Sequence, residues 1–251
     1  MKKKISVIIP YYKNLEYIFH SVNSAIRQKY NNKKIIIIYD DKDKTDLFKL
    51  KKKYKKNKKI RFIINKKNLG VALSRNKGML GSKGYYIAFL DSDDYWKNNK
   101  IIKQINFMKK NSLDLSYTAY DILKNNKKIK HQVQKSYSYD DLIKKCDIGL
   151  STVIMKSKMI KTASFPNLKT QEDYALWLKY LRNGAKIMGI NESLTVWRDK
   201  PNSLSKNVFQ KLSDSFIVYY KFENKNFLES VFSVLILSIN KIKKNLKFNK
   251  I

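Results

Sequence analysis

The chain has 251 residues, 43% of them hydrophobic, which is enough for one large globular domain with its own core. Its 54 basic and 20 acidic residues give a formal net charge of +34, so an anionic partner is favoured: nucleic acid, a membrane surface or a phosphate-bearing substrate. The single cysteine, Cys146, excludes an internal disulfide, and no apolar run approaches the roughly 18 residues of a membrane-spanning helix. With no signal peptide visible, we expect the protein in the cytoplasm.

The first half of the chain alternates short apolar runs with amphipathic segments. We expect strands at residues 5–10, 35–39, 61–65 and 85–90, and helices at 15–28, 45–56 and 71–80. Such alternation is typical of βαβ units with a parallel sheet, whose right-handed crossovers place the strands' carboxyl ends at one edge. Ligands bind at that edge in open α/β sheets.

Beyond residue 97 the alternation weakens. We expect helices at 98–110, 138–145 and 172–183, and strands at 115–123, 129–134, 152–155, 187–190 and 194–197. From about residue 207 the pattern is helical throughout. The second half is therefore predicted to be a mixed part followed by a helical extension.

Asp91 and Asp93 follow the fourth predicted strand directly, in the segment DSDD. Two carboxylates two residues apart can converge on one hard cation, and oxygen ligands suit Mg2+ or Mn2+. A solvated acidic turn has the same spacing. The sequence contains no glycine-rich phosphate loop, so a phosphate group at this edge would need the metal.

Five ordered segments resemble the family 2 glycosyltransferases, which have the GT-A fold and use nucleotide sugars. They are IIPYYKN at 8–14, DDKDKTD at 40–46, NLGVALSRNKG at 68–78, FLDSDDYW at 89–96 and QEDYALWLKYLRNG at 171–184. The resemblance implies a Rossmann-like, mixed but mainly parallel sheet flanked by helices. The catalytic domain would span 1–205, with a nucleotide-binding half at 1–97 and an acceptor-side half at 98–205, and the extension would span 206–251.

The resemblance also implies roles for individual residues on the donor side. Tyr12 and Asp41 would hold the nucleotide base, with Asp40 beside them. Arg75 would also reach the base, and Asp91 would contact the ribose side of the nucleotide.

The remaining roles concern the metal and the chemistry. Asp93, with Asp91 as a second candidate ligand, would bind Mn2+ or Mg2+ across the diphosphate, and Asp173 would be the catalytic base. One base and one metal-assisted leaving group suffice for a single displacement, which inverts the anomeric centre. Asp173 and Glu172 could instead serve the dipole of their helix.

The predicted function is therefore metal-dependent, inverting transfer of one hexose-type sugar. The donor is a nucleotide sugar, with UDP-sugars the commonest in such families, and the acceptor is a hydroxyl of a glycan or lipid-linked glycan. Bacterial members of this kind build surface polysaccharide or lipooligosaccharide. The processive Gln-x-x-Arg-Trp signature is absent.

Three alternatives remain at this point. One is a nucleotidyltransferase on a similar sheet, which would also need a metal-binding acid pair but would normally have a Gly- and Arg/Lys-rich triphosphate loop near the first strand, and IIPYYKN is not such a loop. The second motif has no glycine and Lys13 replaces the usual Asn, which leaves a non-catalytic relative open. The charge leaves a basic nucleic-acid-binding protein open, although arginine is scarce, no nucleic-acid module is recognisable, and a lysine-rich composition is equally typical of an AT-rich genome. We expect no nucleic-acid partner.

The tail has a pattern of its own. Between residues 227 and 242 apolar residues recur at helical spacing, and Lys241, Lys243, Lys244, Lys247 and Lys250 follow. An amphipathic helix with a basic cluster suits an anionic bilayer, which predicts a peripheral protein on the cytoplasmic face of the inner membrane. The alternative is a helix that packs its apolar face on the catalytic domain or on a second subunit.

Overall fold

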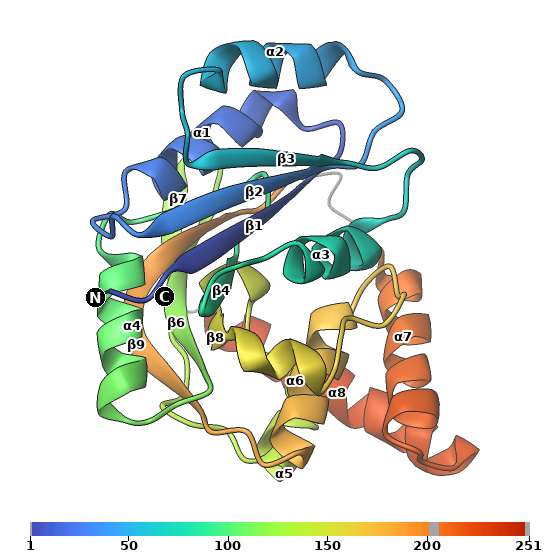
Figure 1. Cartoon of the computed structure of the whole chain (residues 1–251). Helices are drawn as coiled ribbons and strands as arrows, with labels where there is room; N and C mark the ends of the chain where they lie inside the picture. Colours follow the sequence, from blue (N-terminus) through green and yellow to red (C-terminus); the bar gives the residue numbers. More distant parts are fainter. Residues whose placement is uncertain (1, 201–205, 249–251) are drawn as a thin grey trace.

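The computed structural model describes residues 2–200 and 206–248, and a single mixed β-sheet runs through them (Figure 1). Its strands follow the order β3-β2-β1-β4-β8-β6-β9-β5, and β7 pairs with β6 at the side. The strands are β1 (Ile5–Tyr11), β2 (Lys33–Tyr39), β3 (Ile60–Ile64), β4 (Tyr86–Phe89), β5 (Tyr95–Trp96), β6 (Leu115–Lys124), β7 (Lys127–His131), β8 (Ile154–Lys156) and β9 (Ile187–Arg198).

The nucleotide-binding half is parallel, as predicted from its apolar runs. β2 pairs in parallel with β1 and β3, and β1 pairs in parallel with β4. All seven residues of β1 are buried, because helices cover both faces of the sheet. Figure 1 shows α1 (Leu15–Ile26) and α2 (Thr45–Tyr54) on one face and α3 (Val71–Leu80) on the other. The predicted fold class is confirmed.

The second half departs from the prediction in three places. The strands expected at 187–190 and 194–197 are one strand, β9, which shifts its register against β6 near Ala119. β5 was not predicted, since two residues leave no periodic pattern. The helix expected at 138–145 is a single turn, α5 (Tyr139–Leu142). The expected helix at 98–110 is α4 (Lys100–Lys110).

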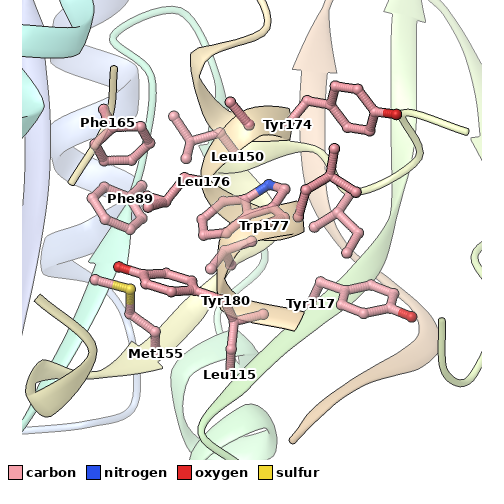
Figure 2. Close-up of a cluster of buried hydrophobic side chains, with 14 of the residues drawn as sticks. Phe89, Leu115, Tyr117, Leu150, Met155, Phe165, Tyr174, Leu176, Trp177 and Tyr180 are labelled. Atoms are coloured by element: carbon pink, nitrogen blue, oxygen red, sulfur yellow. The ribbon is translucent and has the colours of Figure 1, made fainter. Parts of the chain in front are cut away.

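Helix α6 (Glu172–Arg182) is buried on nearly every side and anchors the acceptor-side half. Trp177 is 1% exposed at the centre of the aromatic cluster in Figure 2, where its ring meets Phe165 edge to face at 6.3 Å. Phe165 in turn meets Phe89 of β4 at 5.3 Å. Trp177 is therefore a packing residue, and this cluster fixes the start of α6 relative to the end of β4.

The extension consists of α7 (Val208–Ile217), a π-helical turn at Val218–Phe222, and α8 (Phe227–Phe248). It packs beside α6 (Figure 1) and is tied to it by Glu223, whose Oε2 accepts a 2.8 Å bond from Arg182 Nη1. The predicted boundary between 205 and 206 adjoins residues 201–205, which lie outside the described part of the chain, and the domain division stays a prediction. Within the described residues, no helix is long and apolar enough to cross a bilayer.

Helix α8 turns its apolar stripe away from the protein. Ser230 is fully buried, and Ser233 and Leu237 are each 8% exposed against the rest of the fold. Large apolar side chains on the opposite side are 37–68% exposed: Phe227, Leu228, Val231, Phe232, Leu235, Ile236, Ile239 and Ile242. The alternative in which α8 packs this stripe on its own catalytic domain is thus not what the structure shows. Lys250 lies outside the described residues.

Candidate active site

The acids of the DSDD segment leave β4 in a turn that hydrogen bonds hold in place. The Asp91 backbone N–H donates to Ser151 Oγ at 3.0 Å, and Ser21 Oγ donates to the Asp91 carbonyl at 3.0 Å. The Asp94 N–H closes the turn on the same carbonyl at 3.1 Å. The side chains of Asp91 and Asp93 are 32% and 23% exposed, so both carboxylates are open to a ligand.

Arg75 connects this turn with the start of α6. Its guanidinium comes from α3, is 4% exposed, and donates from Nη2 to Asp91 Oδ1 at 2.6 Å. Nη1 donates to Glu172 Oε1. Burial alone would lower the pKa of Arg75, but Asp91 and Glu172 raise it above its ordinary value. We call this arrangement of Asp91, Arg75 and Glu172 the arginine bridge.

The arginine bridge was not predicted as a unit. The sequence suggested that Arg75 reaches the nucleotide base and that Glu172 could serve the helix dipole. In the structure both terminal nitrogens of Arg75 face carboxylates, while its Nε is buried with no hydrogen-bond partner among the described residues. Its contact with the base stays a prediction.

Asp173 follows Glu172 in the first turn of α6. Its Oδ1 accepts the backbone N–H of Tyr174 at 2.8 Å, and the side chain is half-buried. Burial, then the neighbouring Glu172, raise the pKa of Asp173 to about 7. A helix dipole acting alone would lower that pKa. A carboxylate poised near neutral pH suits a general base.

Asp93 and Asp91 are the residues that fit a divalent cation. Asp93 Oδ2 already attracts a positive group, the Lys200 ammonium, at 2.7 Å. Asp91 uses Oδ1 for Arg75, and no described residue bonds its Oδ2. No cluster of three or more His, Cys, Asp or Glu able to hold a metal occurs in the described ranges. A cation here would therefore take few protein carboxylates and complete its shell with substrate phosphates, as Mg2+ commonly does.

Asp94 has a different environment from its two neighbours. It is 2% exposed, and burial, followed by the charges of Asp93 and Asp91, raises its pKa well above the ordinary range. Its Oδ1 accepts the backbone N–H of Arg198 at 3.1 Å. Asp94 therefore joins the DSDD turn to the end of β9 and is a structural member of the segment.

The predicted base-binding residues lie at the ends of β1 and β2. Tyr12 is 50% exposed, and the Lys13 ammonium lies 5.5 Å from the centre of its ring. Asp41 is nearly buried, and its Oδ1 accepts the backbone N–H of Asp43 at 3.3 Å. Both side chains border the same sheet edge as Asp91, but their role with the base stays a prediction.

Asp40 has a structural task that the sequence did not reveal. Its Oδ1 accepts the Leu69 N–H at 2.8 Å, and its Oδ2 accepts the Gly70 N–H at 2.9 Å. Asn65 adds a third bond from Nδ2 at 2.7 Å. Gly70 has φ of +83°, which favours glycine, so Asp40 holds the tight turn that leads into α3 and Arg75. Its predicted place beside the base is untested.

A group of cations and aromatic rings near Asp93 had no predicted role. The Arg198 guanidinium lies 5.0 Å from the ring centres of Tyr17 and Tyr95, and it also contacts His20 Nδ1. Burial, then Arg198, lower the pKa of His20. This group brings positive charge to the sheet edge beside Lys200.

The sequence matches the family profile described as "Glycosyl transferase family 2" over residues 6–168. It is 32% identical over 250 residues to "Putative teichuronic acid biosynthesis glycosyltransferase TuaG" of Bacillus subtilis (strain 168), covering 98% of each chain. It is 38% identical over 214 residues to "UDP-Glc:alpha-D-GlcNAc-diphosphoundecaprenol beta-1,3-glucosyltransferase WfaP" of Escherichia coli, covering 83% of this chain and 82% of the relative.

Two solved structures have a similar fold. S. aureus TarS 1–349 in complex with UDP-GlcNAc gives a TM-score of 0.72 at 20% identity, over 90% of this chain and 69% of that one. The mannosyltransferase PcManGT from Pyrobaculum calidifontis, in complex with GDP-Man and Mn2+, gives 0.70 at 10% identity, over 93% and 70%. At these identities the likeness concerns the fold alone.

Proposed function

Because this chain belongs to glycosyl transferase family 2 and has the GT-A fold, we propose that it transfers one hexose from a UDP-sugar to a hydroxyl of a lipid-linked glycan. The transfer inverts the anomeric carbon and serves the synthesis of a bacterial surface polysaccharide. The activities named for the relatives, teichuronic acid synthesis and glucosylation of a diphosphoundecaprenol-linked sugar, support this choice of acceptor.

The observation that carries the proposal is the arginine bridge. Asp91 stands at the predicted donor end of the site, and Glu172 stands next to the predicted base. One buried guanidinium binds both, so the predicted donor end and the residue next to the predicted base are held at a fixed separation. Such positioning of reactants lowers the entropic part of a barrier.

On the donor side, Asp93 and Asp91 are the residues that would hold Mn2+ or Mg2+. When bound, the metal supplies positive charge to the diphosphate as the bond to the sugar breaks. Tyr12 and Asp41 border the same edge and would face the base. Lys200 and Arg198 add fixed positive charge close to Asp93.

On the acceptor side, Asp173 takes the proton of the attacking hydroxyl. Its pKa of about 7 leaves a large fraction of the side chain ionised at neutral pH, yet basic enough to accept a proton. The arginine bridge favours this role because the positive charge of Arg75 lowers the pKa of Asp173 and so opposes the rise that burial and Glu172 cause.

The same proposal places the protein on the cytoplasmic face of the inner membrane. The exposed apolar stripe of α8 supports this location, because a soluble helix normally buries such a stripe. Lys243 on the same helix is exposed and would approach anionic headgroups. A membrane-bound enzyme would meet a lipid-linked acceptor at the surface where that acceptor resides.

The test is donor hydrolysis in the absence of acceptor. The purified protein is incubated with UDP-, GDP- and dTDP-sugars, with Mn2+ or with EDTA, and the released nucleoside diphosphate is measured. We expect slow, metal-dependent release from a UDP-sugar. No release from any donor would identify a non-catalytic relative, and equal release in EDTA would refute the metal dependence.

A further inference from the structure

Lys211 of α7 and Lys241 of α8 bring two like charges together beside the start of α6. Lys211 is half-buried, and no described residue forms an ion pair with it or with Lys241. Burial, then the adjacent Lys241, lower the pKa of Lys211 to about 8. A half-buried cation facing a second cation is unfavourable unless an anion binds between them.

Hydrogen bonds fix the position of Lys211 next to the predicted base. One turn further along α7, Asp214 Oδ2 accepts the backbone N–H and the hydroxyl of Thr170, both at 2.8 Å. Gln171 Nε2 donates to Ser215 Oγ at 2.8 Å. These bonds tie α7 to the residues that precede Glu172, and the charge of Asp173 is near enough to act on Lys211.

Lys241 is placed from the other side. It lies four residues after the buried Leu237 and three before Lys244, which pairs with Asp147, so it starts from the same side of α8 as these two residues, although its own side chain is exposed. Asn240 Nδ2 donates to the Lys144 carbonyl at 3.0 Å and holds this turn against the loop that follows α5. The exposed apolar stripe of α8 begins on the other side of the same helix.

Three features therefore occur in the same region: a predicted base, two ammonium groups with no ion-pair partner among the described residues and, across α8 from them, an apolar surface. A lipid diphosphate sugar presents the matching chemistry in the same order, with a hydroxyl to be activated, two phosphates and a hydrocarbon chain. The diphosphate of the donor is a less suitable occupant, because its predicted ligand Asp91 is at the opposite end of the arginine bridge from Glu172, the neighbour of Asp173.

We propose that Lys211 and Lys241 form the subsite that binds the phosphate groups of a lipid-diphosphate acceptor beside Asp173. This inference rests on the proposed function, since it assigns the acceptor side of the same site. It adds the prediction that acceptors are selected by their phosphates as well as by their sugar.

The experiment measures binding of farnesyl diphosphate, a short lipid diphosphate, to the full chain by titration calorimetry at pH 7. Lys211→Gln and Lys241→Gln are prepared singly and together, and Lys51→Gln removes the same charge from an exposed position on α2 as a control. We expect the double variant to bind roughly 10- to 100-fold more weakly, the range for loss of charge-assisted hydrogen bonds, and Lys51→Gln to change affinity less than twofold.

Two further arms identify the source of the phosphate. UDP with Mn2+ is titrated into the same variants, and sedimentation with phosphatidylglycerol vesicles is measured. The proposal expects the double variant to lose affinity for farnesyl diphosphate while it still sediments, because the apolar stripe is intact. Equal loss of UDP affinity would assign the pair to the donor, and equal loss of sedimentation would assign it to lipid headgroups; either result overturns the proposal.

The remaining outcomes separate this inference from the proposed function. If wild-type protein hydrolyses a UDP-sugar but the double variant binds farnesyl diphosphate as tightly as wild type does, only the lysine subsite is refuted. If wild-type protein hydrolyses no donor, the proposed function fails first. Lys211→Gln should not lower the melting temperature, because it removes a charge that the fold disfavours at pH 7. An unchanged melting temperature would show that a loss of binding in this variant is not caused by unfolding.

Discussion

Replacing Arg75 by Met should destabilise the protein through the two carboxylates that it leaves behind. Removing one partner of a buried ion pair costs about 3–5 kcal/mol, because the other charge stays buried without compensation. Glu172, at 6% exposure, accounts for most of this penalty, while Asp91 is 32% exposed and is partly solvated. For a domain of this size, about 2–4 °C of melting temperature corresponds to 1 kcal/mol, so we expect a fall of roughly 6–20 °C.

The sign of the pH dependence follows from Glu172. Burial raises its pKa and the Arg75 charge opposes that rise, so the variant should raise the pKa of Glu172 further above its value in the unfolded chain. The folded variant then binds an extra proton, and its stability relative to wild type is greatest at low pH and falls as the pH rises towards the new pKa. The loss of melting temperature should therefore be smaller at pH 5 than at pH 8.

The assay is thermal unfolding followed by circular dichroism at both pH values. Arg61→Met is the matched control, because Arg61 is exposed and its side chain bonds only the Gly81 carbonyl, at 3.2 Å, among the described residues, so little change is expected. Glu172→Leu combined with Arg75→Met should recover part of the loss, since it removes the stranded charge. The arginine bridge would be refuted as a coupled unit if Arg75→Met were as stable as Arg61→Met. It would also be refuted if the stability loss of the double variant equalled the sum of the losses of its two single variants.

Three further predictions concern activity and location. Asp93→Ala should abolish the Mn2+-dependent part of UDP binding measured by calorimetry, and unchanged metal dependence would remove Asp93 from the metal site. Asp173→Asn should lower turnover by roughly 10²-fold with donor affinity unchanged, and equal losses of affinity and turnover would make Asp173 a donor ligand. Wild-type turnover should rise as the pH passes about 7, because the base must be ionised. The double variant Leu228→Ser/Phe232→Ser should no longer sediment with anionic vesicles at low salt, whereas Phe48→Ser, which removes a similarly exposed ring from α2, should still sediment. If wild-type protein forms dimers and does not sediment with vesicles, the stripe is an interface with a second subunit.

The parallel half of the fold was predictable because the apolar pattern that specifies each strand lies within the residues of that strand. Ile35 to Ile38 form a continuous apolar run that only a strand covered on both faces can bury, and the structure buries all four. β5 escaped prediction because Tyr95 and Trp96 are held by pairing with residues 195 and 196, about a hundred positions away. β9 continues through exposed Asn191 and Glu192, whose polarity indicated a break.

In the site, too, the features specified by local sequence were predicted and those that depend on distant residues were not. Asp91 and Asp93 were placed correctly at a strand end, because a parallel sheet gathers such ends at one edge. The pairing of Arg75 with Glu172 spans 97 residues and depends on how α6 packs against α3, which no local pattern encodes. The amphipathic pattern of α8 likewise defined two faces without saying which one the protein covers, and buried Ser230 shows that it is the small, polar one.

The orientation of α8 has a consequence for how such a chain can diverge. The positions that secure the helix to the fold, Ser230, Ser233 and Leu237, are separate from the outward positions such as Leu228 and Leu235. Substitutions on the outer side alter no internal packing, so they should leave stability within about 0.5 kcal/mol, as is usual for exposed sites. The outer surface can therefore change, and with it the affinity for lipid that we propose for it, while the rest of the fold is inherited unchanged.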